Sequence, residues 1–175
     1  MIPNTYSAFT LNLKLKPGTF RYINHSAYYM SRYDEIWNFD ENEGRWPLGF
    51  LYMTPPDLNQ GEFSTKMVIT APMTWDYVKQ WEDTTVGRRG EEYEKWKAEC
   101  ADKLLDCIEE LYPDFRSCIE AVNTAYPLTI RDWYGVKEAS MCGYSKDCNN
   151  ITLSPDPAVT KVRNLLLTGQ NCNVH

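Results

Sequence analysis

Apolar and polar residues alternate along residues 7–16 of this chain. Phe9, Leu11, Leu13 and Leu15 fall on one face, with Thr10, Asn12, Lys14 and Lys16 on the other. This period of two predicts a β-strand with one face in the core and one in water. Pro17 and Gly18 predict a turn, after which residues 20–23, running on toward 28–30, are expected to form a returning strand.

The same reasoning places further elements along the first two thirds of the chain. Strands are predicted over three ranges, 48–54, 64–71 and 118–124. A single helical turn is expected over residues 34–37. A helix is expected over residues 75–82, opened by Pro72 and Met73, with Thr74 as its N-cap.

The longest helix is predicted over residues 91–111. Its apolar stripe consists of Trp96, Cys100, Leu104, Cys107, Ile108 and Leu111. The first turn is acidic, as the helix dipole favours, and Pro113 ends the helix. A second, short helix is expected to run through Tyr134, capped by Thr129 and ended by Gly135.

The last eleven residues combine an apolar run with a polar end. Residues 136–160 are predicted to be mostly loop, and residues 162–167 to be a strand, in which Leu165–Leu167 suit burial on both faces of a parallel sheet. Gly169 allows a tight turn or the close approach of a ligand. Gln170 and Asn171 follow at the carboxyl end of that strand, where open α/β sheets bind ligands. Taken together, the elements predict an α+β fold: an antiparallel-rich mixed sheet covered by helices on one face.

Composition limits the classes of function. The chain has 175 residues, of which 43% are hydrophobic, as expected for one globular domain. A net charge of −6 argues against nucleic acid as a partner. We expect no transmembrane segment, because no run of about 18 apolar residues occurs, and no signal peptide. The high aromatic content of 14% indicates either core packing or an apolar binding surface.

The six cysteines show no C-x-x-C spacing, and the two histidines lie far from them in sequence. A zinc site is therefore not expected. A disulfide framework is poorly supported in a chain with such a large core, so we predict reduced thiols and a cytoplasmic protein. Peripheral association with a membrane stays open.

Classical catalytic arrangements are not predicted. Glu109 and Glu110 are adjacent on a helix and point about 100° apart, so they cannot flank one bond. No G-x-S-x-G motif accompanies the single internal histidine, His25. Arg131 and Asp132 allow two interpretations: an ion pair that holds its segment in place, or part of a substrate passage.

Three stretches near the C-terminus resemble one flavoenzyme family. They read P-L-T-I-R-D-W-Y-G at residues 127–135, E-A-S-M-C-G at residues 138–143 and N-L-L-L-T-G-Q-N at residues 164–171. In order and spacing they resemble the C-terminal part of the FAD/NAD(P)-dependent family that holds the all-trans-retinol 13,14-reductases (retinol saturases), carotenoid isomerases and phytoene-dehydrogenase-related proteins. Ala139 stands where that family has glycine, and Cys142 at or beside an aromatic position.

The resemblance implies hydride transfer between FAD, with or without NAD(P), and a carbon–carbon double bond of an apolar polyene or isoprenoid-like substrate. It implies that Gly169, Gln170 and Asn171 approach the flavin and assigns no residue an acid or base role. The residues implied to line the substrate passage are Arg131, Asp132, Tyr134, Gly135, Ser140, Met141 and Gly143.

The chain lacks the G-x-G-x-x-G fingerprint that holds a flavin pyrophosphate. We therefore expect residues 1–160 to be a substrate-binding-like domain and residues 161–175 to be a strand and tip of a missing FAD-binding domain. On this view the chain alone binds no FAD tightly and is inactive. The alternative is a non-enzymatic module that binds a lipid or a protein. An exposed C-terminal strand would also allow a homo-oligomer.

Overall fold

A computed structural model describes residues 4–33, 44–146, 149 and 158–169 of the chain. Its strands form one sheet in the order β2-β3-β4-β1-β5, and every pairing is antiparallel. The strands are β1 (Ser7–Leu15), β2 (Ala27–Met30), β3 (Gly49–Met53), β4 (Lys66–Met73) and β5 (Ile119–Ala125). The alternating segment at residues 7–16 is therefore a strand, as predicted, and it lies between β4 and β5.

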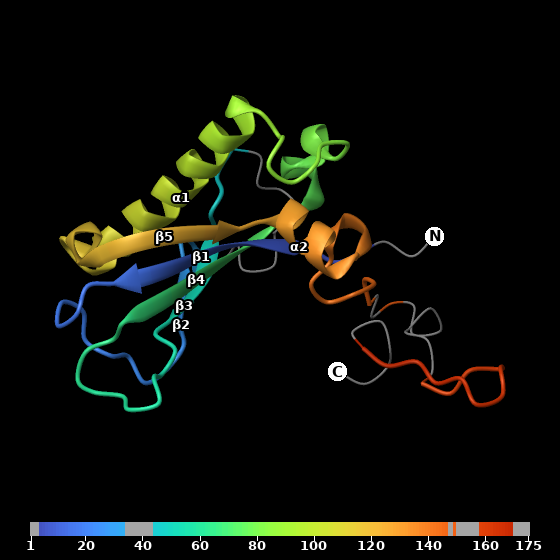
Figure 1. The fold of residues 1–175 in the computed structure, drawn as a ribbon, viewed down its shortest axis with the longest axis horizontal. Coiled ribbons are helices and arrows are strands. Elements are labelled where there is room, and N and C mark those ends of the chain that lie inside the picture. The colour runs from blue at the N-terminus through green and yellow to red at the C-terminus, as the bar shows by residue number, and fades with distance from the viewer. Residues whose placement is uncertain (1–3, 34–43, 147–148, 150–157, 170–175) are drawn as a thin grey trace.

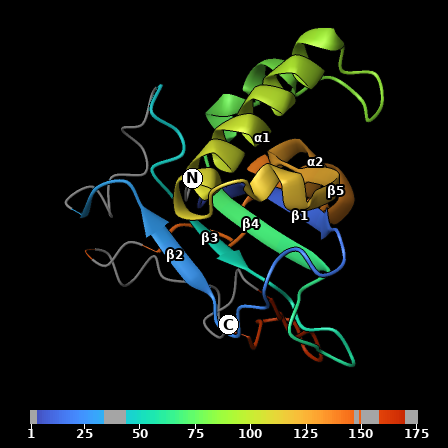
Figure 2. The same cartoon turned by 90° about the vertical axis from the view of Figure 1, so that its left-hand side faces the viewer.

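One face of the sheet packs against the long helix α1 (Glu91–Leu111), whose bounds agree with the prediction (Figures 1 and 2). Leu11 of β1 pairs with Ile69 of β4, and both are fully buried. Leu104 and Ile108 of α1 are buried in the same core cluster. The predicted α+β class, with a sheet covered on one face, is confirmed.

The other face of the sheet carries no helix among the described residues. Paired residues of antiparallel strands share a face, so this face can be read from the register. Leu51 pairs with Tyr28 of β2 on one side and with Thr70 of β4 on the other. The apolar part of the face, which we call the open apolar face, consists of Tyr28, Met30, Leu51, Met53 and Val68. Four of these side chains are half-buried, and Tyr28 is 77% exposed.

Most of the aromatic residues whose role was open belong to the core. Phe9 contacts Trp46 and Trp96 with ring centroids 5.4 and 6.4 Å apart, in edge-to-face geometry. Tyr93 stacks on Trp96 and meets Tyr126 edge-on. Aromatic packing therefore accounts for much of the high aromatic content.

The described cysteines are free thiols. Cys100, Cys107, Cys118 and Cys142 form no disulfide, and burial raises the pKa of the Cys100 thiol to about 12.

Two local predictions before α1 are wrong. Residues 75–82 form two short 3₁₀ turns, η2 (Trp75–Tyr77) and η3 (Lys79–Trp81), and Thr74 makes no capping hydrogen bond with its side chain. Pro72 and Met73 do not begin a helix but extend β4, because Ala8 and Ser7 of β1 continue the pairing past Ala71.

Residues 20–23 do not form a strand either. Arg21 makes one isolated bridge to Phe63, and Phe20 instead fills the core beside Tyr112 and Phe115. The next strand is β2, which begins at Ala27 and pairs with β3 rather than back with β1. The helical turn predicted over residues 34–37 lies outside the described residues.

The prediction of a buried strand over residues 162–167 is also wrong. Leu165, Leu166 and Leu167 are 49%, 70% and 40% exposed, and the only pairing there is an isolated bridge between Val159 and Leu166 among the described residues. The Leu167 amide donates to the Ala158 carbonyl, 2.8 Å away, so the segment folds back on itself. A strand buried on both faces needs layers above and below it, and the described part of the chain supplies neither.

Candidate functional site

The first stretch of the flavoenzyme resemblance forms helix α2 (Pro127–Tyr134), directly after β5. Pro127 occupies its first turn, where a missing N–H costs nothing. The N-cap is Tyr126 rather than the predicted Thr129, which lies inside the helix. Gly135 ends the helix as predicted, with φ at +66° in the left-handed region.

The backbone at Gly135 explains its residue type and allows a clean test. A Cβ at this position would meet no atom within 4 Å, so only the left-handed φ opposes a side chain. We expect Gly135→Ala to lower the free energy of unfolding by about 1 kcal/mol in urea denaturation. Gly61→Ala is the matched control, because Gly61 has equal space and no left-handed φ, and it should be neutral. An equal loss in both variants would contradict this explanation.

Arg131 and Asp132 are tied into an ion-pair network that crosses from α2 to the loop before α1. The guanidinium of Arg89 donates to the Asp132 carboxylate, and Arg131 Nε donates to its other oxygen at 2.8 Å. The Arg89 side chain is only 5% exposed and that of Asp132 is 18% exposed. Arg89 also donates to the Thr84 hydroxyl at 2.9 Å. This geometry favours the interpretation of Arg131 and Asp132 as an ion pair that holds its segment in place, over a role in a substrate passage.

Arg131 also reaches the segment that follows β4. Its Nη1 donates to the Glu82 carbonyl at 2.5 Å, and its guanidinium lies 5.6 Å from the centroid of the Trp75 ring. Beside it opens a cleft of about 510 Å³. The cleft is lined by Trp75, Asp76, Lys79, Glu82, Asp83, Arg131, Lys137 and Glu138. Such a charged, mixed-sign lining is unsuited to an apolar polyene.

The second stretch of the resemblance, residues 138–143, is hydrogen-bonded to residues 5 and 6, which directly precede β1. The hydroxyls of Thr5 and Ser140 lie 2.7 Å apart, and the Gly143 carbonyl lies within hydrogen-bonding reach of both. The Met141 amide donates to the Tyr6 carbonyl at 3.2 Å. Ser140 is 2% exposed, whereas Met141 is 36% exposed beside Tyr6. Ser140 and Gly143 thus fix this segment, and Met141 and Cys142 present accessible side chains.

Ala139 occupies a conformation that normally favours glycine. Its φ is +53°, within the short turn η5 (Lys137–Ala139), and its side chain is fully buried. The family that the chain resembles has glycine at this position. The left-handed φ explains that glycine, because this conformation costs an alanine about 1 kcal/mol or more.

The remaining predicted site residues are not brought together with these. Tyr134 is 77% exposed on the outer side of α2, next to Trp133 at 79%. Gly169 is exposed in the C-terminal segment, with φ at +115°. Gln170 and Asn171 lie outside the described residues.

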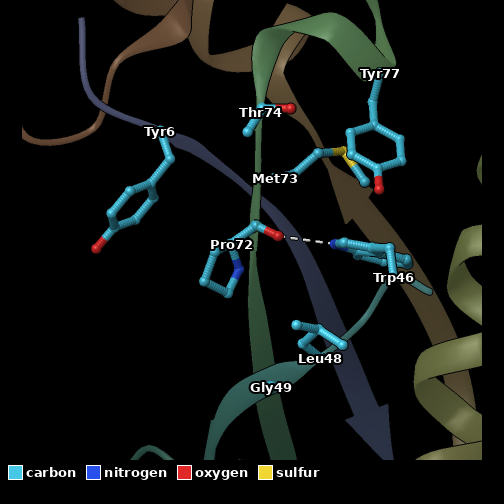
Figure 3. Close-up of a pocket in the computed structure, with 8 residues that line it drawn as sticks. All are labelled: Tyr6, Trp46, Leu48, Gly49, Pro72, Met73, Thr74 and Tyr77. Atoms are coloured by element: carbon cyan, nitrogen blue, oxygen red, sulfur yellow. Dashed lines mark hydrogen bonds between the residues drawn. The ribbon is translucent and has the colours of Figure 1, made fainter. Parts of the chain in front are cut away.

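An apolar pocket lies at the end of the sheet, next to the segment held by Thr5 (Figure 3). Its lining residues are Tyr6, Trp46, Leu48, Gly49, Pro72, Met73, Thr74 and Tyr77. The Trp46 indole donates to the Pro72 carbonyl at 2.8 Å, as Figure 3 shows. The cavity measures about 10 Å³, room for about one water molecule. It is therefore far smaller than a pocket that would enclose a polyene.

Sequence reasoning did not find Thr5, Tyr6 or the role of Arg89. Arg89 was visible only as one of two arginines in a break between helices, and Thr5 carried no pattern at all.

Among the described residues, no group of three metal-ligating side chains gathers. No described helix has both the length and the apolar character needed to cross a bilayer.

Comparison with known proteins supports one part of the resemblance. No family model and no solved structure matches the chain. The curated proteins that match are all-trans-retinol 13,14-reductases. The human protein is 23% identical over 108 residues, which are 60% of this chain and 18% of the human protein. The chain resembles these reductases.

Two proteins of Danio rerio extend the match over more of the chain. One reductase is 24% identical over 143 residues, 77% of this chain and 23% of the relative. An "inactive all-trans-retinol 13,14-reductase" is 25% identical over 149 residues, 79% of this chain and 24% of the relative. The chain thus spans about a fifth to a quarter of the length of these reductases. Similarity to carotenoid isomerases and phytoene-dehydrogenase-related proteins stays a prediction.

Proposed function

We propose that this chain is the substrate-side part of a flavin-dependent oxidoreductase acting on carbon–carbon double bonds of an apolar polyene or isoprenoid-like substrate. The observation that carries the proposal is the similarity to all-trans-retinol 13,14-reductases over as much as 77% of the chain. On this proposal residues 1–160 form the substrate-side domain. Residues 161–175 form a terminal portion of the FAD-binding domain.

The described residues do not fit a flavin pyrophosphate. A helix N-terminus can hold such a group, and α1 is the long helix of the described chain. Its first turn carries Glu91, Glu92 and Glu94, however, which would repel an anion there. Gly90 precedes them with φ at +88°, but no G-x-G-x-x-G turn accompanies it. We therefore infer that another polypeptide segment holds the FAD and that the isolated chain has no reductase activity.

The open apolar face is the surface that best suits a polyene. The pocket at Trp46 is too small, and the cleft at Arg131 is charged. Leu51, Met53 and Val68 instead offer a half-buried apolar strip with no helix over it among the described residues. One wall leaves a ligand half in water, so binding by this chain alone should be weak. Met141, implied by the resemblance, is proposed to extend the passage toward the flavin.

All-trans-retinol is the probe that tests this function. Titration into the purified chain should quench tryptophan fluorescence saturably, and the protein should carry no flavin absorbance. Leu51→Glu places a charge on the open apolar face and should weaken binding roughly tenfold or more. Leu111→Glu is the control, because Leu111 is 42% exposed on α1, and it should bind as the unaltered chain does. Quenching that is absent, or unchanged in Leu51→Glu, would contradict the proposal, as would stoichiometric flavin surviving gel filtration.

A second candidate is a non-enzymatic module that binds a lipid or a protein. It is favoured by the match to the relative named inactive, which covers 79% of this chain. The genomic reading frame upstream of Met1 separates the two. A G-x-G-x-x-G turn between a strand and a helix there supports the oxidoreductase, and a native start codon supports the module.

A further inference from the structure

We propose that two copies of this chain associate by strand addition, with the C-terminal hairpin of each copy pairing along the edge of β5 of the other. The C-terminal hairpin is the segment of residues 158–167 that folds back on itself through the Leu167–Ala158 hydrogen bond. Thr160 stabilises it, since its hydroxyl lies 2.9 Å from the Leu165 carbonyl and 3.1 Å from the Val162 carbonyl.

The hairpin presents an apolar surface that monomers seldom leave in water. Its exposed aliphatic residues are Val159 at 71%, Val162 at 60%, Leu165 at 49%, Leu166 at 70% and Leu167 at 40%. It lies beyond α2 and away from α1 (Figure 1). Its sequence is rich in β-branched and leucine residues and contains no proline. These features favour addition to an existing strand edge.

Charge favours a copy of the same chain as the partner. Residues 158–167 contain Lys161 and Arg163 and no acidic residue, so the hairpin carries +2. The whole chain carries −6, so its remainder carries −8. Helix α1 contributes eight acidic and three basic residues to that remainder. The chain therefore holds both a basic apolar element and an acidic body that attracts it.

The edge of β5 is the better of the two edges to receive the hairpin. The sheet order leaves β5 paired only with β1, and β5 has seven residues, whereas β2 at the opposite edge has four. Residues 120–123 of β5 are all exposed. The single charged residue of β5, Glu120, is already paired with Lys14 at 2.5 Å. This strand lacks the lysine or proline residues that usually protect an edge.

Each chain offers one C-terminal hairpin and one β5 edge. Reciprocal exchange about a two-fold axis satisfies both at once and closes the assembly as a dimer. The inference does not depend on the proposed function, since it uses only the hairpin, the edge and their charges.

Light scattering coupled to gel filtration tests the proposal on the full chain. From about 1 to about 200 µM, the mass should rise from that of a monomer to that of a dimer. Leu166→Ser on the hairpin and Ala121→Lys on β5 should each raise the dissociation constant roughly tenfold or more. Both residues are exposed, so the fold should survive, as circular dichroism would verify.

Tyr28→Lys is the matched control. Tyr28 is 77% exposed on β2, the opposite edge of the sheet, and its replacement should leave the dissociation constant unchanged. A monomer across the whole concentration range would overturn the proposal and leave the hairpin to a different polypeptide. A dimer that resists either Leu166→Ser or Ala121→Lys, or that Tyr28→Lys disrupts, would overturn it as well.

Discussion

Asp132→Ala is expected to destabilise the chain by about 3 kcal/mol, which for a protein of this size lowers the melting temperature by about 6–12 °C. The reason is the Arg89 guanidinium, whose side chain is 5% exposed and would be left as a buried, uncompensated charge. Arg131 would lose its partner at 2.8 Å as well. The free energy of unfolding from urea denaturation measures the effect.

Two controls separate this explanation from a general sensitivity to substitution. Lys14→Ala breaks an ion pair whose side chains are 63% and 44% exposed, so it should cost less than about 1 kcal/mol. Combining Asp132→Leu with Arg89→Leu removes both charges and should recover much of the stability lost in Asp132→Leu alone. A double variant less stable than the single one would show that the buried charge is not the cause.

Leu104→Ala should cost about 3 kcal/mol, an effect of similar size with a different origin. Leu104 is fully buried in the core between α1 and the sheet. Its truncation removes apolar contact and leaves a cavity that the surrounding strands fill only in part. The urea midpoint should fall while the slope of the transition stays constant, since the unfolded chain is little altered.

Leu111→Ala provides the matched comparison on the same helix. The sequence pattern places Leu104 and Leu111 on one apolar stripe, yet Leu111 is 42% exposed at the end of α1. Its truncation should cost less than about 1 kcal/mol. Similar losses for the two leucines would mean that the end of α1 is covered in solution.

The sequence alone determined the elements whose signal repeats along the chain. The bounds of α1 follow from a long stripe of period 3.6, an acidic first turn and a proline beyond its end. The strand β1 follows from the alternation at residues 7–16. In both cases the apolar or polar type of each residue indicates which way its side chain faces, so the element is encoded locally.

The tertiary structure decided which segments meet. Asp132 pairs with Arg89 across 43 positions, and Ser140 meets Thr5 across 135 positions. Residues 162–167 read as a buried strand, but burial requires neighbours that the described chain does not supply. The sequence predicts that Pro72 opens a helix, yet its pairing with Ala8 of β1 keeps it in an extended strand. A local pattern fixes the face of an element but not its partner, because the partner depends on contacts between residues far apart in sequence.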